Sequence, residues 1–179
     1  MLATHLDAEL RYSAYRTEVF KQVKEFLTYP DSHHIRLSDI DHKALTQARL
    51  WHDIPERSVN FDWEHDCRLY RKLYPKRFEL AIWHQNRLES LALGRPSYSG
   101  TRVRLELVER LARNSQLKGR AFVITELSLM AYAALLGAEE IRIMEPINES
   151  VKNYYISRGY RYVPSTGATH FPDYCVKKL

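Results

Sequence analysis

Residues 116–121, with the sequence QLKGRA, place a glutamine, a glycine and an alanine at the spacing Q-x-x-G-x-A. They stand between a predicted strand at 102–111 and a predicted helix that begins near Gly119. The first N–H groups of a helix lack partners within the helix and lie at the positive end of its dipole, so they favour phosphate. Gly119 would let the main chain approach a pyrophosphate closely, and Lys118 and Arg120 add positive charge. The pattern also suits an ordinary helix entry, because glycine and alanine are common residues.

A second segment, NESVKNYYISRGY at 148–160, carries a spacing of its own. It reads as a helix with Asn148 as the N-cap and Gly159 as the residue that ends it. Tyr155 lies seven residues after Asn148, and Tyr160 directly follows the glycine.

Together, the two segments resemble the GNAT N-acetyltransferase superfamily. That family carries a Q/R-x-x-G-x-G/A loop between its fourth strand and third helix, and a pattern close to N-x-x-A-x-x-L-Y-x-x-x-G-F/Y after its fifth strand. The second pattern is met here by Asn148, Val151 for the small residue, Tyr154 for Leu, Tyr155, Gly159 and Tyr160. Both patterns occur in the expected order. The resemblance is best over residues 78–160 and extends less securely to HIRLSDIDHKALTQA at 34–48.

The resemblance implies an enzyme that moves an acetyl group from acetyl-CoA to a primary amine by direct attack, without a metal. It implies that Tyr155 protonates the leaving thiolate, a task that suits a phenol because it is still protonated at neutral pH. It also implies that the strand at 105–109 pairs with the pantetheine arm and that the 116–121 loop holds the pyrophosphate. The cofactor-binding residues it indicates are Leu107, Val108, Gln116, Leu117, Lys118, Gly119, Arg120, Ala121 and Asn148.

A general base is harder to assign, because many members use a carboxylate near the middle of the fourth strand. Glu106 and Glu109 are the candidates, and strand alternation predicts that they point to opposite faces. We favour Glu109, which lies nearer the point where this strand should diverge from its neighbour. The alternative is that both glutamates are surface residues or pair with Arg104 or Arg110.

Hydrophobic spacing predicts the elements that would position these residues. Helices are expected over 7–29, from a cap at Ser38 or Asp39, and from Asp62 to the residue before Pro75. Two strands joined by a tight turn at 85–86 follow, then the strand at 102–111, the helix after the loop, a strand over EEIRIMEP, the helix from Asn148 and one or two closing strands. This order predicts a mixed α/β, or α+β, fold: a mostly antiparallel sheet flanked by helices.

Three departures from the family pattern concern the acceptor more than the fold. RLARNS makes the connection to Gln116 long or irregular, and Ala121 replaces the more frequent second glycine. The third departure is an expected helical extension at residues 1–32, before an expected GNAT-like domain at 33–179. We expect the extension to pack on the sheet or to mediate dimerisation.

Composition excludes several classes of protein. The 179 residues carry a net charge of +5, which indicates at most a preference for anionic ligands. Two distant cysteines fit a reducing compartment, and the eight histidines show no ligand spacing for zinc. A serine elbow and a catalytic cysteine signature are both lacking. Without an apolar N-terminal core or a membrane-length apolar run, the chain reads as cytoplasmic with no membrane partner.

The segment RLYRKLYPKR at 68–77 concentrates five basic residues with Tyr70 and Tyr74. It reads as a solvated helix face or as a contact for nucleic acid. The acceptor is therefore left open between a small molecule, a protein and a tRNA. A catalytically inactive GNAT-fold protein that binds nucleic acid, and a toxin-type enzyme acting on aminoacyl-tRNA, are the alternative functions. Trp63 and Tyr70 lie seven residues apart, which predicts one helical face packed against the sheet.

Overall fold

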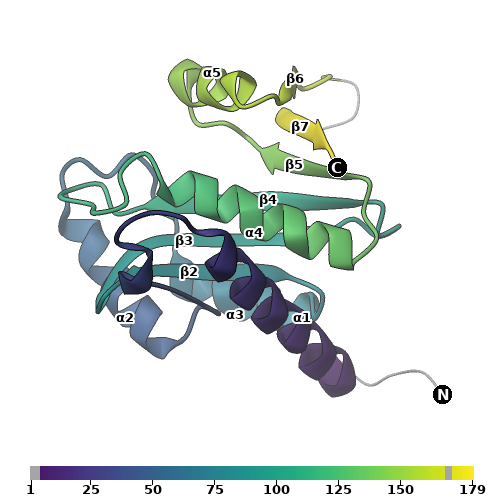
Figure 1. Ribbon diagram of the computed structural model, residues 1–179. Coiled ribbons are helices and arrows are strands. Elements are labelled where there is room, and N and C mark those ends of the chain that lie inside the picture. The colour runs from purple at the N-terminus through teal and green to yellow at the C-terminus, as the bar shows by residue number, and fades with distance from the viewer. Residues whose placement is uncertain (1–4, 168–170) are drawn as a thin grey trace.

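Helices and strands are mixed along the chain in the computed structural model, which describes residues 5–167 and 171–179 (Figure 1). The helices are α1 (His5–Phe26), α2 (His42–Arg49), α3 (Trp63–Leu73), α4 (Ala121–Leu135) and α5 (Glu149–Ser157), with short 3-10 helices η1 (Ser32–His34) and η2 (Leu50–Asp53). The strands are β1 (Ile35–Ser38), β2 (Phe78–His84), β3 (Arg87–Pro96), β4 (Arg102–Arg110), β5 (Glu140–Met144), β6 (Arg161–Val163) and β7 (Tyr174–Lys178).

The seven strands of the described residues belong to one sheet with the order β1-β2-β3-β4-β5-β7-β6. Every neighbouring pair is antiparallel except β4 and β5, which run parallel. The parallel pairing begins at Arg102–Glu140 and ends at Leu105–Ile143, so the second half of β4 is not joined to β5. The expected fold class, a mostly antiparallel sheet flanked by helices, is confirmed.

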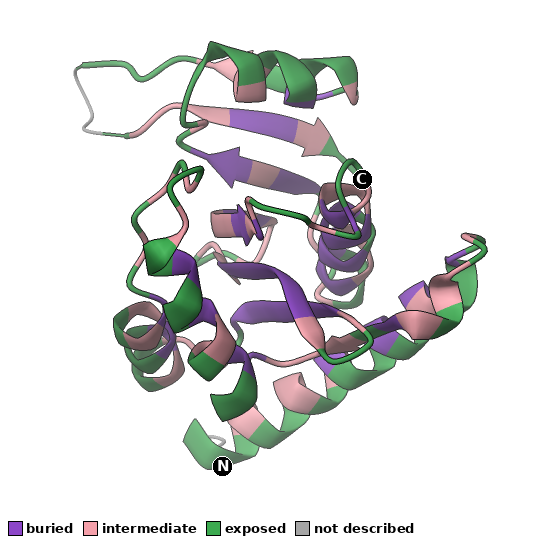
Figure 2. Ribbon diagram, turned by 90° about the vertical axis from the view of Figure 1, so that its left-hand side faces the viewer, coloured by how far each residue is buried: buried purple, intermediate pink, exposed green. Residues whose placement is uncertain are grey.

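Helices cover the two faces of the sheet, each over its own apolar cluster. On one face, α1 and α4 pack side by side, and α1 buries Val19, Phe20 and Val23 in the cluster that α4 shares. On the other face, α2 and α3 cover β2 and β3, with Trp51 and Trp63 among the buried side chains. Figure 2 shows the central strands as buried, with exposed residues on the outer sides of the helices.

A β-bulge in β4 changes which way its side chains point. Leu93 of β3 pairs with Leu107, whereas the next residue, Gly94, pairs with Leu105, so Glu106 is the extra residue of the bulge. Gly94 is needed at this point because a Cβ there would lie 2.1 Å from the carbonyl oxygen of Arg104. After such a bulge, the alternation of faces is shifted by one residue.

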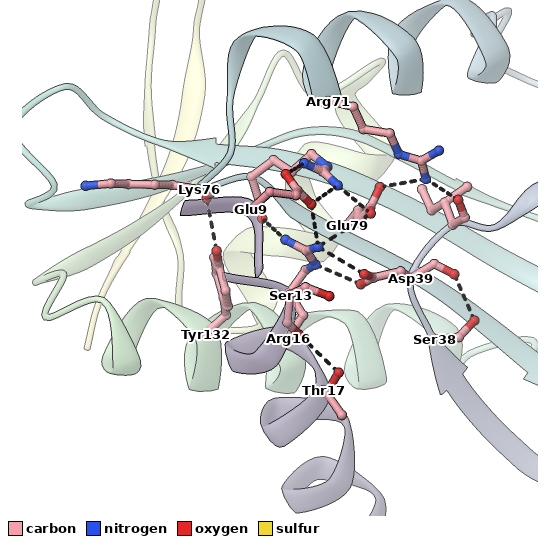
Figure 3. Close-up of polar contacts among 12 residues, drawn as sticks. Glu9, Ser13, Arg16, Thr17, Ser38, Asp39, Arg71, Lys76, Glu79 and Tyr132 are labelled. Carbon is pink, nitrogen blue, oxygen red and sulfur yellow. Dashed lines mark hydrogen bonds and ion pairs between the residues drawn. The ribbon is translucent and has the colours of Figure 1, made fainter. Parts of the chain in front are cut away.

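The described part of the expected extension, residues 5–32, is fastened to the sheet by a buried ionic cluster. Arg16 of α1 donates to both carboxylate oxygens of Asp39, at 2.8 and 3.0 Å, and Arg77 donates to Glu9 of α1 and to Glu79 of β2. Figure 3 shows Glu9, Arg16, Asp39 and Glu79 of this cluster converging between α1, β2 and the segment after β1. The helix therefore packs on the sheet, one of the two roles expected for it.

Three of the helix starts test the predicted caps. Asp62 accepts from the N–H of His65 at 3.0 Å and Asn148 from that of Val151 at 2.9 Å, which confirms both of these caps. The cap of α2 is Asp41, so the prediction of Ser38 or Asp39 was wrong. The carboxylate of Asp39 is instead taken up by Arg16.

A further difference concerns α4, which begins at Ala121 and not near Gly119. Gly119 has a φ of 79°, a left-handed conformation that glycine adopts without strain and that a helix cannot continue through. Among the described helices, none has the length and apolar character needed to cross a membrane.

Candidate active site

A cleft of about 400 Å³ opens where β4 and β5 separate. Its walls come from the second half of β4, the end of β5, the start of α4, the inner side of α5 and the loop that precedes α3. Among the residues expected to have a role, Glu106, Val108, Glu109, Gly119 and Tyr155 line it. The other expected residues are not part of its lining: Leu107, Gln116, Leu117, Lys118, Arg120, Ala121 and Asn148.

Tyr155 is held on the cleft wall by aromatic packing. Its ring lies 4.9 Å from that of Phe122 on α4 and 6.1 Å from that of Tyr160, measured between centroids. Burial, with smaller contributions from Cys175 and Tyr154, raises the pKa of the Tyr155 phenol well above its usual value. The phenol is therefore a proton donor throughout the neutral range.

Asn148 stands at the start of the same helix as Tyr155. Its side chain is occupied by the cap and the residue is exposed to solvent. The role that the structure gives to Asn148 is therefore to begin the helix that carries Tyr155.

The carboxylate of Glu109 accepts three hydrogen bonds inside the protein. Arg57, in the loop before α3, donates from Nε at 2.6 Å and from Nη2 at 3.0 Å, and the indole Nε1 of Trp63 donates at 2.7 Å. Both Arg57 and Glu109 are almost fully buried at their side chains. A carboxylate has about four lone-pair positions, so one acceptor position is left for a further ligand or water.

Glu106 lies on the same face of the sheet as Glu109, so the prediction that they point to opposite faces was wrong. Tyr70 of α3 donates its hydroxyl to Glu106, and Trp63 of the same helix donates to Glu109. The physical reason is the bulge at Glu106, which makes three residues of β4 span what two would span in a regular strand. Glu106 also pairs with Arg95 at 3.1 Å.

The loop at 116–121 divides into buried and exposed residues. Leu117 and Ala121 are buried in the α1–α4 cluster, while Gln116, Lys118 and Gly119 are exposed. The signature residues of the loop therefore differ in what they do, since the apolar ones serve the core and only the exposed ones can meet a ligand.

Several N–H groups of the loop and of the first turn of α4 are free to bind. The N–H groups of Arg120 and Ala121 both donate to the carbonyl of Leu117 at 2.9 Å, so they are committed to the turn. Four N–H groups that follow Leu117 have no acceptor among the described residues: those of Lys118, Gly119, Phe122 and Val123. Any main-chain phosphate contact here would therefore fall to these four groups.

Arg120 connects this loop to Asp31, which precedes η1. It forms a two-pronged ion pair with Asp31, at 2.6 and 2.9 Å, and donates to the carbonyl of Gln116 at 2.8 Å. Arg120 also lies over the ring of Tyr29, and its hydrogen bonds hold the pKa of Asp31 well below its usual value. Its charge is thus already paired, which leaves Lys118 as the exposed cation of the loop.

The open edge of β4 supplies main-chain groups to the cleft. The N–H of Leu111 donates to the carbonyl of Glu89, which is on β3, and antiparallel pairing alternates from there. Leu107 and Glu109 therefore direct their main-chain groups toward β3, and Val108 directs its groups toward β5, with which pairing has already ended. Of the two residues expected to contact the pantetheine arm, Val108 is placed to pair with an extended ligand and Leu107 is not.

These features fit the phosphate and pantetheine parts of acetyl-CoA. The free N–H groups around Gly119 suit a pyrophosphate, and the unpaired edge at Val108 suits an amide-bearing chain. Within the part of the chain that the structure describes, no three histidine, cysteine or carboxylate side chains are grouped as a metal site would need.

The basic segment at 68–77 is in part structural. Arg71 and Arg77 both pair with the buried carboxylate of Glu79, at 3.2 and 3.0 Å. Arg68, Lys72 and Lys76 are exposed. The number of cations that this segment can offer to a polyanion is therefore smaller than its sequence indicates.

Sequence reasoning missed Arg57 and Phe122, and it placed Trp63 on the sheet-facing side of its helix without assigning it a role. Arg57 stands in an irregular loop, and nothing local in SVNFDW or in the residues before it indicates a partner 52 positions away. The prediction that Trp63 and Tyr70 share a buried face is confirmed, since both are buried on α3. Their N–H and O–H groups were the signal for a polar partner on the strand above them.

Comparison with known proteins agrees at the level of structure. No protein-family model matches the sequence, and no sequence among the curated proteins matches it. The fold is similar to that of an acetyltransferase from Thermus thermophilus, with a TM-score of 0.60 and 17% identity over 81% of this chain and 97% of that one. It is also similar to the ribosomal-protein-S18-alanine N-acetyltransferase from Escherichia coli, with a TM-score of 0.57 and 12% identity over 81% and 92% of the two chains. The spermidine/spermine N-acetyltransferase SpeG from Vibrio cholerae gives a TM-score of 0.58 and 14% identity over 82% and 94%. The chain therefore has the fold of the GNAT N-acetyltransferases, as its two sequence segments predicted.

Proposed function

We propose that this protein transfers an acetyl group from acetyl-CoA to a primary amine. The observation that carries the proposal is the convergence of three independent features on one cleft. These are the end of β4–β5 pairing after Leu105, the free N–H groups around Gly119 and the phenol of Tyr155. The fold shared with acetyltransferases supports it, and two of the similar structures bear names that state an amine acceptor.

In this proposal, the free N–H groups around Gly119 bind the pyrophosphate, and the main chain of Val108 aligns the pantetheine arm along β4. The amine attacks the acetyl carbonyl, the carbon–sulfur bond breaks, and Tyr155 Oη gives its proton to the departing thiolate. A neutral phenol in an apolar wall suits this step, because protonation of the thiolate is required as the bond breaks.

The proton that the amine loses needs an acceptor of its own. Glu109 stays our proposed acceptor, working through its one remaining lone-pair position or through a water. Glu106 is the second carboxylate of β4 within the same cleft. If Glu109 is the acceptor, Glu109→Gln removes the acid limb of the pH–rate profile, whereas Glu106→Gln leaves that limb in place.

Calorimetric titration with acetyl-CoA tests the proposal, using the wild type and Gly119→Glu. The new side chain would fill the open space over the loop and place a negative charge where phosphate should bind. Gly137→Glu is the matched control, because Gly137 has a φ of 71°, also faces open space and stands at the far end of α4. We expect binding in the wild type and in the control and its loss in Gly119→Glu. Absence of binding by the wild type would overturn the proposal.

A further inference from the structure

Three arginines stand directly opposite one another across three adjacent strands. Arg95 of β3 is the register partner of Arg104 of β4, and Arg104 is the register partner of Arg142 of β5. Register partners project from the same face of a sheet, so the three side chains form one row. Arg142 pairs next with Val176, which pairs with Arg161, so a fourth arginine continues the row on β6.

This row lies on the face that carries α2 and α3, but beyond the area those helices cover. Their apolar cluster takes its strand residues from β2 and β3 and, from β4, only Leu107. The row is bordered instead by aromatic rings: Arg95 lies over Tyr74, Arg142 over Tyr174, and Arg104 5.9 Å from Phe171. All three arginines are only partly buried, so the row is open to a ligand.

The arginines outnumber the carboxylates that face them. Glu106 pairs with Arg95, while Glu140 pairs with Arg142 at 2.7 Å and is shared with Arg102 and Lys178.

Arg104 is the member of the row that forms no ion pair with any described residue. Within residues 5–167 and 171–179, no carboxylate lies within ion-pair distance of it, and its buried Nε has no acceptor. Burial, followed by the charges of Arg95, Arg142 and Arg102, lowers the pKa of Arg104, and the charge of Glu106 offsets this only in part. A guanidinium that is buried at one nitrogen and flanked by two arginines of the same row is a site where an anion would be stabilised.

Such a row destabilises the folded state, because like charges directly opposite each other on a sheet repel. A buried guanidinium N–H without an acceptor adds a further cost. A bound anion would remove both costs, since guanidinium groups match carboxylate and phosphate oxygens in geometry and charge. A bound ligand would therefore account for this feature.

The row leads directly into the cleft. Glu106 is two residues after Arg104 on β4, and Met144, which lines the cleft, is two residues after Arg142 on β5. Two residues of strand span about 7 Å. The loop around Gly119, by contrast, follows the opposite end of β4. The arginines therefore lie beside the end of the cleft that Glu106 and Met144 line, where we place the acceptor. They lie apart from the residues proposed to bind pyrophosphate.

We propose that Arg95, Arg104 and Arg142 form an anion subsite for the acceptor, so that the preferred substrate is an amine carrying a carboxylate or phosphate about 7 Å or more from its amino group. The part of this inference that concerns the substrate rests on the proposed acetyl transfer. The part that concerns anion binding at the row is independent of that activity.

Four peptides test the subsite, in two matched pairs. All four are C-terminal amides, so that they carry no α-carboxylate. Ala-Glu-Glu-Gly is compared with Ala-Gln-Gln-Gly, and Ala-pSer-Gly-Gly with Ala-Ser-Gly-Gly, by calorimetric binding and by acetylation at about 150 mM salt, where exposed charges are screened. We expect each acidic peptide to bind and react at least about tenfold better than its neutral partner, as one charged hydrogen-bonded contact gives. Preference in one pair alone would support the subsite and identify its anion as carboxylate or as phosphate.

Arg104→Gln is the decisive variant, because it removes no existing ion pair. We expect it to abolish the preference for acidic peptides while leaving acetyl-CoA affinity unchanged and not lowering the melting temperature. Arg68→Gln, at an exposed position on α3, is the charge-matched control and should keep the preference. Equal binding of acidic and neutral peptides, or equal effects of the two variants, would overturn the inference. Absence of acetyl-CoA binding by the wild type would instead count against the proposed function, and the calorimetric arm would still decide on the subsite.

Discussion

The pair formed by Arg57 and Glu109 predicts a large and strongly non-additive effect on stability. Arg57 ties the loop before α3 to the second half of β4 through two hydrogen bonds of 2.6 and 3.0 Å. The side chains are only 7% and 4% exposed, so removal of either one leaves a charge with little access to water. Loss of one partner of a buried pair typically costs about 3–5 kcal/mol.

We therefore expect Arg57→Met and Glu109→Gln each to lower the free energy of unfolding by about 3–5 kcal/mol. The double variant leaves no uncompensated charge, and the glutamine carbonyl can still accept from Trp63. Its loss should be only about 1–2 kcal/mol, for the hydrogen bonds that Arg57 also makes to Phe61 and His52. Urea denaturation of the four proteins, followed by tryptophan fluorescence, measures the cycle.

A matched surface pair provides the control for that cycle. Glu56 lies in the same loop and is 3.7 Å from Arg113, but both side chains are more than half exposed, at 53% and 64%. Their coupling should be below about 1 kcal/mol. The reasoning is refuted if the Arg57 and Glu109 losses simply add in the double variant, or if the two cycles give equal coupling.

Three further predictions concern single residues. Tyr155→Phe should lower kcat strongly while the affinity for acetyl-CoA stays nearly unchanged. Tyr154→Phe, on the same cleft wall, should retain both the kcat and the affinity of the wild type. Parallel losses of kcat and affinity in Tyr155→Phe would show that Tyr155 has a structural role. Arg16→Met should destabilise the protein by about 3–5 kcal/mol in urea denaturation, because Arg16 is only 1% exposed and pairs with carboxylates on three segments; a loss below about 1 kcal/mol would contradict this. Burial raises the pKa of Cys67 to about 12, and Cys175 is also buried. At pH 8, a thiol reagent should therefore label neither cysteine until urea is added. Rapid labelling of the folded protein would contradict this, because it would show that the thiols are accessible.

The parts of the fold that the sequence predicts are those set by local signals. The caps at Asp62 and Asn148, the turn at Gln85 and the end of α5 at Gly159 depend on residues within a few positions of each other. The cap of α2 was missed because Asp39 and Asp41 are equally suited to it by type. Arg16, a residue on a distant helix, decides which of the two is free.

In the candidate site, too, the sequence predicts what local signals set and misses what distant residues decide. The Q-x-x-G-x-A spacing located the loop, yet Arg120 and Ala121, which the pattern includes, serve the turn and the core, whereas Phe122, just outside the pattern, offers a free N–H. Strand alternation assigned Glu106 and Glu109 to opposite faces because a period of two holds only without a bulge. The signal for the bulge is Gly94, on another strand, and it can be recognised only once β3 and β4 are paired.

The bulge at Glu106 also connects the two proposals made for this protein. In a regular strand, Arg104 and Glu106 would share one face with Val108, and Glu109 would face α4. The bulge instead brings Glu109 onto the face of Arg104 and Glu106 and turns Val108 toward the α4 side. Along the face that carries α2 and α3, one strand thereby presents cations and then carboxylates, with a free main-chain edge beside Val108 where pairing with β5 has ended. An acceptor with an anionic group and an amine matches that order of charges, and an amine without the anion would leave Arg104 without an ion-pair partner.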